Sequence, residues 1–492
     1  MSQAATLHQQ AIFERARLSR DARFDGRFFI GVRTTGIYCR PICPAVSPKS
    51  ENVSFYPSAA AAAEAGYRPC LRCRPECAPG TPAWSGTSTT VRRGLRLIAD
   101  GALEESSVER LAERLGVTSR HLRRLFARHV GASPLAVAHT QRLHFAKRLI
   151  DETDLPMATV AEAAGYGSVR RFNDSFRKTY GRTPRELRRR RELPLEPGSA
   201  LTVRLTSRKP FDWQALLGFL EARATPGVEQ VLGDAYLRTI ELDGRPAVIE
   251  CRSDASETLS LSLHGVATGM LFGVVQRTRE LFDLDAPVAE IAGVLRADPV
   301  LRSLLRRCPG VRVPGAWDGY ELLVRAILGQ QVSVKAATTL AGRIAERYGQ
   351  AVEVPASLAH YGKSLSLSRL FPRPSRLARA RFNRIGLVAA RAATIRRVAA
   401  ATAAGELRFD AGARPDEVCE QLTALPGVGD WTAQYVAMRA LKDPDAFPST
   451  DLGLVRAIAG TPAELKSRAA AWRPWRAYAA MLLWGSLPSS GG

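Results

Sequence analysis

The chain has 492 residues and a formal net charge of +23, from 70 Lys and Arg against 47 Asp and Glu. This length exceeds what one hydrophobic core supports, so about three or four domains are expected. The basic balance favours a polyanionic partner such as nucleic acid. No apolar run approaches the roughly 20 residues that span a bilayer, and residues 1–20 lack a signal-peptide pattern. These features predict a cytoplasmic, nucleoid-associated protein with no membrane partner.

Five of the eight cysteines lie within residues 39–77, which in a reducing compartment indicates metal binding rather than disulfides. Two close pairs match a closed tetrahedral Zn²⁺ site with four thiolate ligands: Cys39 and Cys43, Cys70 and Cys73. So small a domain, with little apolar content, needs the metal to fold. We therefore expect one Zn²⁺ in a small α/β domain over residues 1–80. Five nearby arginines would face a phosphate backbone: Arg33, Arg40, Arg68, Arg72 and Arg74.

The segments Val32-Arg-Thr-Thr-Gly-Ile-Tyr-Cys39-Arg-Pro and Glu51-Asn-Val-Ser-Phe-Tyr56 resemble the N-terminal domain of the Ada adaptive-response family. In that family the first cysteine irreversibly accepts a methyl group from a DNA methylphosphotriester. The resemblance implies that Cys39 is the acceptor, whereas the spacing alone does not choose among the four cysteines. Methylating one thiolate makes the site less negative and weakens its repulsion of phosphate. The alternative is a purely structural zinc knuckle.

Residues 91–190 have a helical period throughout, with two helix-turn-helix units at 107–126 and 160–176 around a long helix at 134–150. Ser119 is expected to cap the second helix of the first unit. The arrangement resembles the AraC-type DNA-binding domain, which implies promoter DNA, and with it RNA polymerase, as partners. In that family the second helix of each unit enters the major groove. The implied base or phosphate contacts are Arg120, His121, Arg124, Ser168, Arg170, Arg171 and Asn173.

Residues 84–90 and 188–199 are predicted to be linkers, because they are small and polar or rich in Pro and Gly. Strand-like alternation then appears in four stretches: 201–206, 236–242, 246–252 and 258–263. Helices are predicted at 212–223 and 266–280. Together these elements predict a small antiparallel α+β domain over residues 200–285, followed by an all-α domain over 286–492. The whole chain is thus predicted to be multidomain and mainly α.

The segment Leu425-Pro-Gly-Val-Gly-Asp430 is a two-glycine turn between apolar helices, and a lone carboxylate follows at Asp451. Such a turn leaves backbone N–H groups at a helix start, where a DNA phosphate is favoured. Gly427 and Gly429 are therefore candidate DNA contacts. Taken alone, the turn is more typical of an ordinary helix corner.

The hairpin at 425–435, the pair Pro448 and Asp451, and the segment from Trp317 through Gly329-Gln-Gln-Val-Ser333 resemble the AlkA-type 3-methyladenine DNA glycosylases of the helix-hairpin-helix superfamily. The similarity extends over about residues 200–488. It implies that an alkylated nucleotide leaves the duplex and that its N-glycosidic bond is hydrolysed. Asp451 would stabilise the oxocarbenium ion and help to direct water to C1′.

Superfamily members with lyase activity carry a Schiff-base Lys just after the hairpin glycines, where this chain has Trp431. Tryptophan forms no imine, so base removal without strand cleavage is predicted. Trp431, Tyr435 and Trp484 are expected to stack on cationic 3-methyl and 7-methyl purines, at about 0.5–2 kcal/mol each. Their alternative role is ordinary core packing. Gln331 stands where the best-known member inserts an apolar wedge, which leaves the lesion range open.

The Pro-Cys-His-Arg motif of the second Ada methyltransferase domain is absent, so repair of O6-methylguanine is not expected. The sequence as a whole predicts a fusion of an alkylation sensor and regulator with a glycosylase that acts on double-stranded DNA. The alternative hypothesis is a transcription factor whose glycosylase-like half is catalytically inactive.

Overall fold

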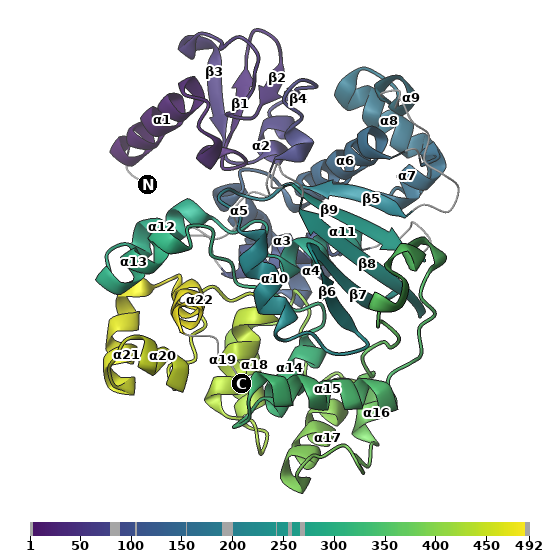
Figure 1. Cartoon of the computed structure of the whole chain (residues 1–492). Coiled ribbons are helices and arrows are strands. Elements are labelled where there is room, and N and C mark those ends of the chain that lie inside the picture. Colours follow the sequence, from purple (N-terminus) through teal and green to yellow (C-terminus); the bar gives the residue numbers. More distant parts are fainter. Residues whose placement is uncertain are drawn as a thin grey trace.

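The computed structural model of the chain describes residues 3–78, 89–103, 106–153, 155–188, 200–242, 244–253, 258–265 and 271–487. Almost all of the linkers predicted at 84–90 and 188–199 lie outside the described residues, as does the start of the helix predicted at 266–280. Figure 1 shows four parts that follow one another from purple to yellow. We call them the N-terminal, helix-turn-helix, sheet and helical modules.

The N-terminal module, residues 3–78, is built on a four-stranded sheet of order β3-β1-β2-β4. Strand β1 is antiparallel to β2 and β3, and β2 is parallel to β4. The rings of Phe13, Phe28 and Phe55 form a small aromatic core. The elements are α1 (Gln3–Leu18), β1 (Phe29–Val32), β2 (Ile37–Cys39), β3 (Val53–Tyr56), α2 (Ala59–Glu64), β4 (Arg68–Pro69) and short 3-10 turns at Ala22–Phe24, Ser50–Asn52 and Pro75–Cys77.

The helix-turn-helix module, residues 89–188, places the two predicted units on either side of one long helix, α6. The prediction that Ser119 caps the second helix is wrong by one residue. Thr118 has the extended backbone of a cap, and its side chain accepts a hydrogen bond from the His121 N–H at 3.2 Å. The elements are α3 (Thr89–Ala99), α4 (Val108–Arg114), α5 (Ser119–His129), α6 (Pro134–Glu152), α7 (Met157–Ala163), α8 (Val169–Tyr180) and α9 (Pro184–Leu187).

The N-terminal module packs on α6 through a polar, largely buried contact. The Tyr38 hydroxyl lies 2.8 Å from Nε2 of His144. Burial lowers the pKa of His144 to about 3, so its ring is neutral at physiological pH. One turn further along α6, Lys147 lies 2.5 Å from Asp151, and Arg74 reaches the same carboxylate at 2.9 Å. Because Tyr38 and Arg74 each neighbour a cysteine in sequence, the cysteine pairs are held close to α6.

The sheet module, residues 200–284, is a five-stranded antiparallel sheet of order β5-β9-β8-β7-β6. All four predicted strands and both predicted helices are present, the second helix from Leu271 onward. The sequence pattern does not reveal β6, because this strand has only four residues and begins with a glutamate that is buried through ion pairs. The elements are β5 (Leu201–Leu205), α10 (Trp213–Glu221), β6 (Glu229–Leu232), β7 (Ala235–Leu242), β8 (Arg245–Ser253), β9 (Leu259–His264) and α11 (Leu271–Leu281).

The sheet module shares its core with the helix-turn-helix module. A single buried cluster contains Phe172 and Phe176 of α8 together with side chains of β5, β8 and α11. Phe145 of α6 contacts Phe272 of α11, with 4.9 Å between the ring centroids. In Figure 1 the helices α6–α9 accordingly lie beside β5 and β9. The two modules are therefore packed together rather than tethered.

The helical module, residues 286–487, has one large core. None of the helices in the described ranges is long and apolar enough to cross a membrane. The elements are α12 (Val288–Leu295), α13 (Pro299–Arg307), α14 (Gly319–Leu328), α15 (Val334–Tyr348), α16 (Pro374–Ala378), α17 (Ala389–Ala403), α18 (Pro415–Thr423), α19 (Asp430–Arg439), α20 (Leu452–Ala457), α21 (Pro462–Ala469), α22 (Arg476–Ser486) and 3-10 segments at Ala356–Ser364 and Ala470–Trp472.

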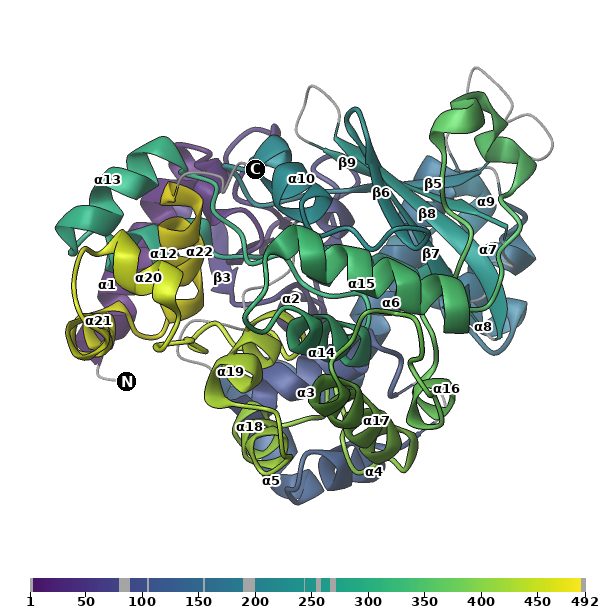
Figure 2. The same cartoon turned by 60° about the horizontal axis from the view of Figure 1, so that its bottom comes forward.

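Helix α3 docks on the sheet and helical modules through two arginines. Arg96 donates hydrogen bonds to the Glu280 carboxylate and to the Leu441 carbonyl, both at 2.9 Å. Arg93 donates to the Gly412 carbonyl at 2.9 Å. The Leu441 carbonyl lies just beyond the end of α19, where a cation complements the helix dipole. Figure 2 shows α3 lying against α18 and α19, in agreement with these contacts.

A buried ion-pair network joins the sheet module to α14. Arg238 bonds to both Glu229 and Glu321, and Arg325 donates to the same two carboxylates at 3.0 Å. Burial by itself raises the pKa of Glu229, but Arg325 and Arg238 hold it at about 2. The network is therefore charged and paired throughout, deep in the protein.

Arg238→Met is expected to lower the free energy of unfolding by about 3–5 kcal/mol, because both carboxylates lose a buried partner. The matched control is Arg373→Met, which removes an exposed pair with Glu241 and should cost about 0–1 kcal/mol. Urea unfolding measures both. The folded pKa of Glu229 is depressed from 4.5, so its contribution is present above that value and is lost as the pH falls toward 2. Equal losses in the two variants would contradict this expectation.

Candidate active site and metal centre

Asp451 lies at the start of α20, where its side chain caps the helix. Its Oδ1 accepts hydrogen bonds from the Leu454 backbone N–H at 2.9 Å and from the Trp484 indole at 3.0 Å. Its Oδ2 accepts a hydrogen bond from the Trp431 indole at 2.7 Å. A carboxylate has about four acceptor positions, so one remains for another group. The half-buried carboxylate is thus fixed by donors from three helices, α19, α20 and α22.

Two of the predicted aromatic residues, Trp431 and Trp484, contact this carboxylate, and Tyr435 packs against both of their rings. Trp431 and Tyr435 lie four residues apart on one face of α19 and stack, with centroids 5.1 Å apart and planes 9° apart. Trp484 of α22 meets Tyr435 at 6.2 Å between centroids. The structure therefore brings together Asp451 and the three aromatic residues predicted to hold a base. It also shows that both indole N–H groups are directed at Asp451, which the sequence did not indicate.

Three residues that the sequence pattern does not single out lie beyond Tyr435. The Arg439 guanidinium donates to the Tyr435 hydroxyl at 2.5 Å. Arg439 Cζ lies 4.9 Å from the ring centroid of Phe219, and Arg223 Cζ lies 3.9 Å from the same centroid. Burial by itself raises the pKa of Tyr435, but Arg439 and Arg223 hold it below its usual value. Arg439 follows Trp431 and Tyr435 at the same four-residue interval, and this spacing is the only sequence signal that could have placed it on their face of the helix. Phe219 and Arg223 come from the sheet module, which is distant in sequence, so no local signal could have indicated them.

The turn between α18 and α19 has the geometry that its glycines require. Gly427 has a φ of +91°, which L-residues rarely adopt. Gly429 is the N-cap of α19 and offers no side-chain cap, so the N–H groups of the first turn remain open to an anion. Gln330 donates to the Gly427 carbonyl at 3.1 Å. The neighbouring Gln331, predicted as the wedge, is exposed beside the turn with a φ of +57°.

Gly427→Ala is expected to distort the turn and weaken duplex binding about tenfold, since an L-residue in this backbone region costs about 1–2 kcal/mol. In addition, an added Cβ would lie 2.1 Å from Oγ1 of Thr394. Gly429→Ala is the matched control, because its φ is −97° and the described residues place no atom within 4 Å of the new Cβ. Fluorescence anisotropy with a labelled duplex compares the two. Equal affinities would show that the turn does not contact DNA.

The metal centre is formed by four of the five clustered cysteines. Their Sγ atoms all lie within 4.8 Å of one another, which suits Zn–S bonds of about 2.3 Å in a tetrahedral site. Two of these cysteines are half-buried and two are buried. The Arg40 backbone N–H donates to the Cys73 sulfur at 3.3 Å. Cys77 lies outside the cluster, and burial raises its pKa to about 11, which keeps it a thiol. The ligand residues are Cys39, Cys43, Cys70 and Cys73.

The arginines around the metal centre have two different roles. Arg40 forms an ion pair with Asp25, and Arg74 forms one with Asp151, so both are engaged inside the protein. The expectation that they face a phosphate backbone is therefore not met. Arg68 is exposed, as are Arg33 and Arg72. A DNA contact near the metal centre would rely on these exposed side chains.

The residues predicted to contact promoter DNA lie on α5 and α8. Ser168 caps α8 by accepting a hydrogen bond from the Arg171 N–H at 3.2 Å, so its hydroxyl already has a structural role. His121 and Asn173 are half-buried. The four predicted arginines are all exposed: Arg120, Arg124, Arg170 and Arg171.

Three family models match successive parts of the chain. The metal binding domain of Ada matches residues 13–76, a helix-turn-helix domain matches 111–190, and the AlkA N-terminal domain matches 202–318. The first of these contains the four convergent cysteines. The protein accordingly holds a single Zn²⁺ through four thiolates, as predicted.

The "Probable bifunctional transcriptional activator/DNA repair enzyme AlkA" of Mycobacterium tuberculosis is 42% identical over 482 residues, covering 96% of this chain and 95% of that protein. The chain belongs to this family. The Escherichia coli DNA-3-methyladenine glycosylase 2 is 32% identical over 281 residues, which cover 56% of this chain and 94% of that enzyme. The Escherichia coli enzyme Ada is 33% identical over 171 residues, which cover 35% of this chain and 47% of Ada. The family assignment thus accounts for both halves of the chain.

Among solved structures, the 3-methyladenine DNA-glycosylase of Archaeoglobus fulgidus matches with a TM-score of 0.50 and 23% identity, over 57% of this chain and 96% of that one. This match shows that the sheet and helical modules share the glycosylase fold. The predicted mainly α, multidomain architecture of this family member is therefore confirmed.

Proposed function

We propose that this protein is a DNA alkylation-repair enzyme and adaptive-response regulator. It removes 3-methyl and 7-methyl purines by hydrolysis of the N-glycosidic bond, and it transfers the methyl group of DNA methylphosphotriesters to Cys39. The observation that carries the glycosylase assignment is Asp451, whose carboxylate is held by the two indole N–H groups of Trp431 and Trp484 beside an aromatic face.

The glycosylase step follows from that geometry. An alkylated nucleotide extruded from the duplex places its base against the rings of Trp431, Tyr435 and Trp484 and its sugar near Asp451. The C1′–N bond breaks with its electron pair going to the base nitrogen, and the sugar becomes an oxocarbenium ion. The fixed carboxylate opposes this positive charge without having to reorient. Water then adds to C1′ and loses a proton, leaving an abasic site and the free base.

The methyl-transfer step uses the most accessible sulfurs of the metal centre. Cys39 and Cys43 are half-buried, whereas Cys70 and Cys73 are only 8% and 7% exposed, so a phosphotriester reaches the sulfurs of Cys39 and Cys43 more easily. A bound Zn²⁺ keeps the sulfurs in the thiolate form. The Cys39 thiolate attacks the methyl carbon, the C–O bond breaks, and a phosphodiester anion leaves. The thioether that forms is stable, so each molecule reacts once.

Both halves of the protein contact DNA, the C-terminal half at the lesion and the N-terminal half at the promoter. Gly427 and Gly429 hold a phosphate of the damaged duplex, and Gln331 fills the gap that the extruded nucleotide leaves. Promoter DNA is bound by the four exposed arginines of α5 and α8, which implies RNA polymerase as a further partner and the nucleoid as the site of action. The proposed domain limits are 1–80, 91–190, 200–285 and 286–492.

Incubation with a duplex that contains 3-methyladenine tests the glycosylase. The wild type is expected to release the free base while the strand stays intact until alkali is added, because Trp431 forms no Schiff base. Strand cleavage without alkali would contradict the monofunctional assignment. Absence of base release would favour the alternative, a transcription factor with an inactive glycosylase-like half.

Peptide mass spectrometry after exposure to methylphosphotriester DNA tests the acceptor. Fragmentation of the peptide that carries both Cys39 and Cys43 is expected to place an addition of about 14 Da on Cys39. Cys308 is an internal control, because it is exposed and lies outside the metal centre. Methylation of Cys308 would indicate non-specific alkylation, and methylation of Cys43 would overturn the choice of acceptor.

A further inference from the structure

The aromatic face proposed to hold the base has charges of opposite sign at its two ends. Trp431, Tyr435 and Arg439 follow one another at four-residue intervals along α19, a span of about 12 Å from first to last. Asp451 is bonded to the Trp431 indole at one end. Arg439 is bonded to the Tyr435 hydroxyl at the other. A base stacked on the aromatic face, with its sugar at Asp451, therefore extends toward a guanidinium.

The charge of Arg439 is not neutralised by an adjacent carboxylate. Its side chain donates to the Pro314 carbonyl at 2.7 Å, the Gly315 carbonyl at 2.9 Å and the Tyr435 hydroxyl, and the residue is only 3% exposed. Within the described residues, no salt bridge involves it. A buried guanidinium held only by neutral acceptors is costly, which calls for a function.

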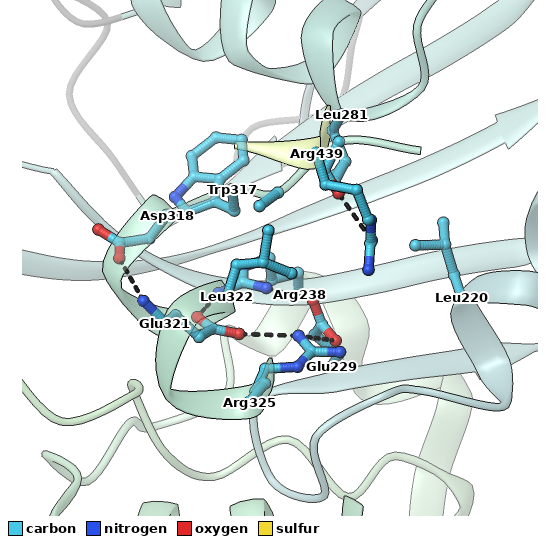
Figure 3. A pocket seen from close by; sticks show the side chains of 12 residues that line it. Leu220, Glu229, Arg238, Leu281, Trp317, Asp318, Glu321, Leu322, Arg325 and Arg439 are labelled. Atoms are coloured by element: carbon cyan, nitrogen blue, oxygen red, sulfur yellow. Dashed lines mark hydrogen bonds and ion pairs between the residues drawn. The ribbon is translucent and has the colours of Figure 1, made fainter. Parts of the chain in front are cut away.

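A second guanidinium reinforces the first. Arg223 lies over the ring of Phe219 and donates to the Phe219 carbonyl at 3.2 Å, and in the described part of the chain it too has no salt bridge. Figure 3 shows the contrast in a pocket that Arg439 also lines: Arg325 pairs there with Glu229 and Glu321, whereas no ion pair joins Arg439 to these carboxylates. The wall beyond Tyr435 thus carries two positive charges that its own contacts leave uncompensated.

We propose that Arg439 and Arg223 promote cleavage electrostatically, by favouring movement of the electron pair of the C1′–N bond from the sugar to the base. The proposal rests on the glycosylase function proposed above. As the C1′–N bond breaks, its electron pair moves to the base nitrogen, toward Arg439, while positive charge accumulates on the sugar, toward Asp451. Both displacements follow the electric field between Asp451 and the two arginines.

The field has different consequences for cationic and neutral bases. A cationic base such as 7-methylguanine is repelled by the arginines in the bound state and becomes neutral as it leaves. For this base the arginines raise the maximal rate but weaken binding, so the two effects cancel in the specificity constant. A neutral base such as O2-methylthymine leaves as an anion, which the arginines attract. For that base they raise both the maximal rate and the specificity constant.

Arg223→Met is the preferred test, because among the described residues the side chain of Arg223 contacts only the ring and carbonyl of Phe219 and the hydroxyl of Tyr435. Single-turnover rates are measured against enzyme concentration with each lesion. For 7-methylguanine we expect the maximal rate and the half-saturating concentration to fall together by about tenfold, with their ratio unchanged. For O2-methylthymine the ratio itself should fall about tenfold. Arg223→Lys keeps the charge and should resemble the wild type.

The outcomes separate this proposal from a structural role. If both lesions lose maximal rate and specificity constant equally, the arginine merely supports the fold, and the proposal is wrong. An unchanged maximal rate with 7-methylguanine, or no release of O2-methylthymine by the wild type, would also overturn it. Failure of the wild type to release either base would instead reject the glycosylase function itself.

Discussion

Asp451→Asn is expected to lower the rate of base excision by about 10²–10³-fold, the loss typical of removing one preorganised electrostatic stabiliser. Asparagine is isosteric, and its Oδ1 can still accept the Leu454 N–H, so it caps α20 as Asp451 does. Its amide nitrogen cannot accept the hydrogen bond of the Trp431 indole, so a loss of stability of about 1–3 kcal/mol is expected. What disappears is the negative charge opposite C1′. Single-turnover release of 3-methyladenine measures the rate, and anisotropy with the same duplex should show unchanged binding.

Asp430→Asn is the matched control for this variant. Asp430 is an exposed carboxylate in the first turn of α19, close to the hairpin but without a hydrogen bond to either indole among the described contacts. Its replacement removes the same charge and should leave the excision rate within about twofold of the wild-type rate. Phosphate binding at the turn should become slightly stronger, because a negative charge is lost there. If both variants lose activity equally, the general charge of the site matters rather than Asp451.

Cys70→Ala is expected to abolish zinc binding and unfold the N-terminal module, because a structural Zn²⁺ site contributes about 10–16 kcal/mol to folding. The module has only small aromatic and alanine clusters besides the metal centre. Since it packs on α6 through Tyr38 and Lys147, promoter binding should weaken as well. Base excision should persist, because Asp451 and its donors belong to α19, α20 and α22.

Metal analysis, near-ultraviolet circular dichroism and the excision assay together test this expectation. Cys77→Ala is the control, because Cys77 is close in sequence but lies outside the cluster of sulfurs. It should retain one Zn²⁺ per chain. A Cys70→Ala protein that keeps its full zinc content would contradict the four-thiolate site, and loss of excision would mean that the halves are functionally coupled through the α6 and α3 contacts.

The sequence by itself determined the elements whose signal is local. Paired cysteines, helical periodicity and alternating strands depend on residues a few positions apart, so the metal ligands, the long helix α6 and the strands β7–β9 could all be predicted. Errors arose where the local signal was ambiguous: Thr118 and Ser119 are both good caps, and only the backbone angles of Thr118 make it the cap. Strand β6 has only four residues, which are too few to show the alternation of buried and exposed side chains that marks a strand.

Only the tertiary structure decided what each of these side chains contacts. The indoles of Trp431 and Trp484 are directed at Asp451, and Arg40 is withdrawn into an ion pair with Asp25, because helices and loops distant in sequence meet there. The sequence likewise did not indicate which residues lie next to Arg439. Hydrogen bonds, burial and charge compensation depend on the packing of distant segments, and local sequence patterns carry no information about that packing.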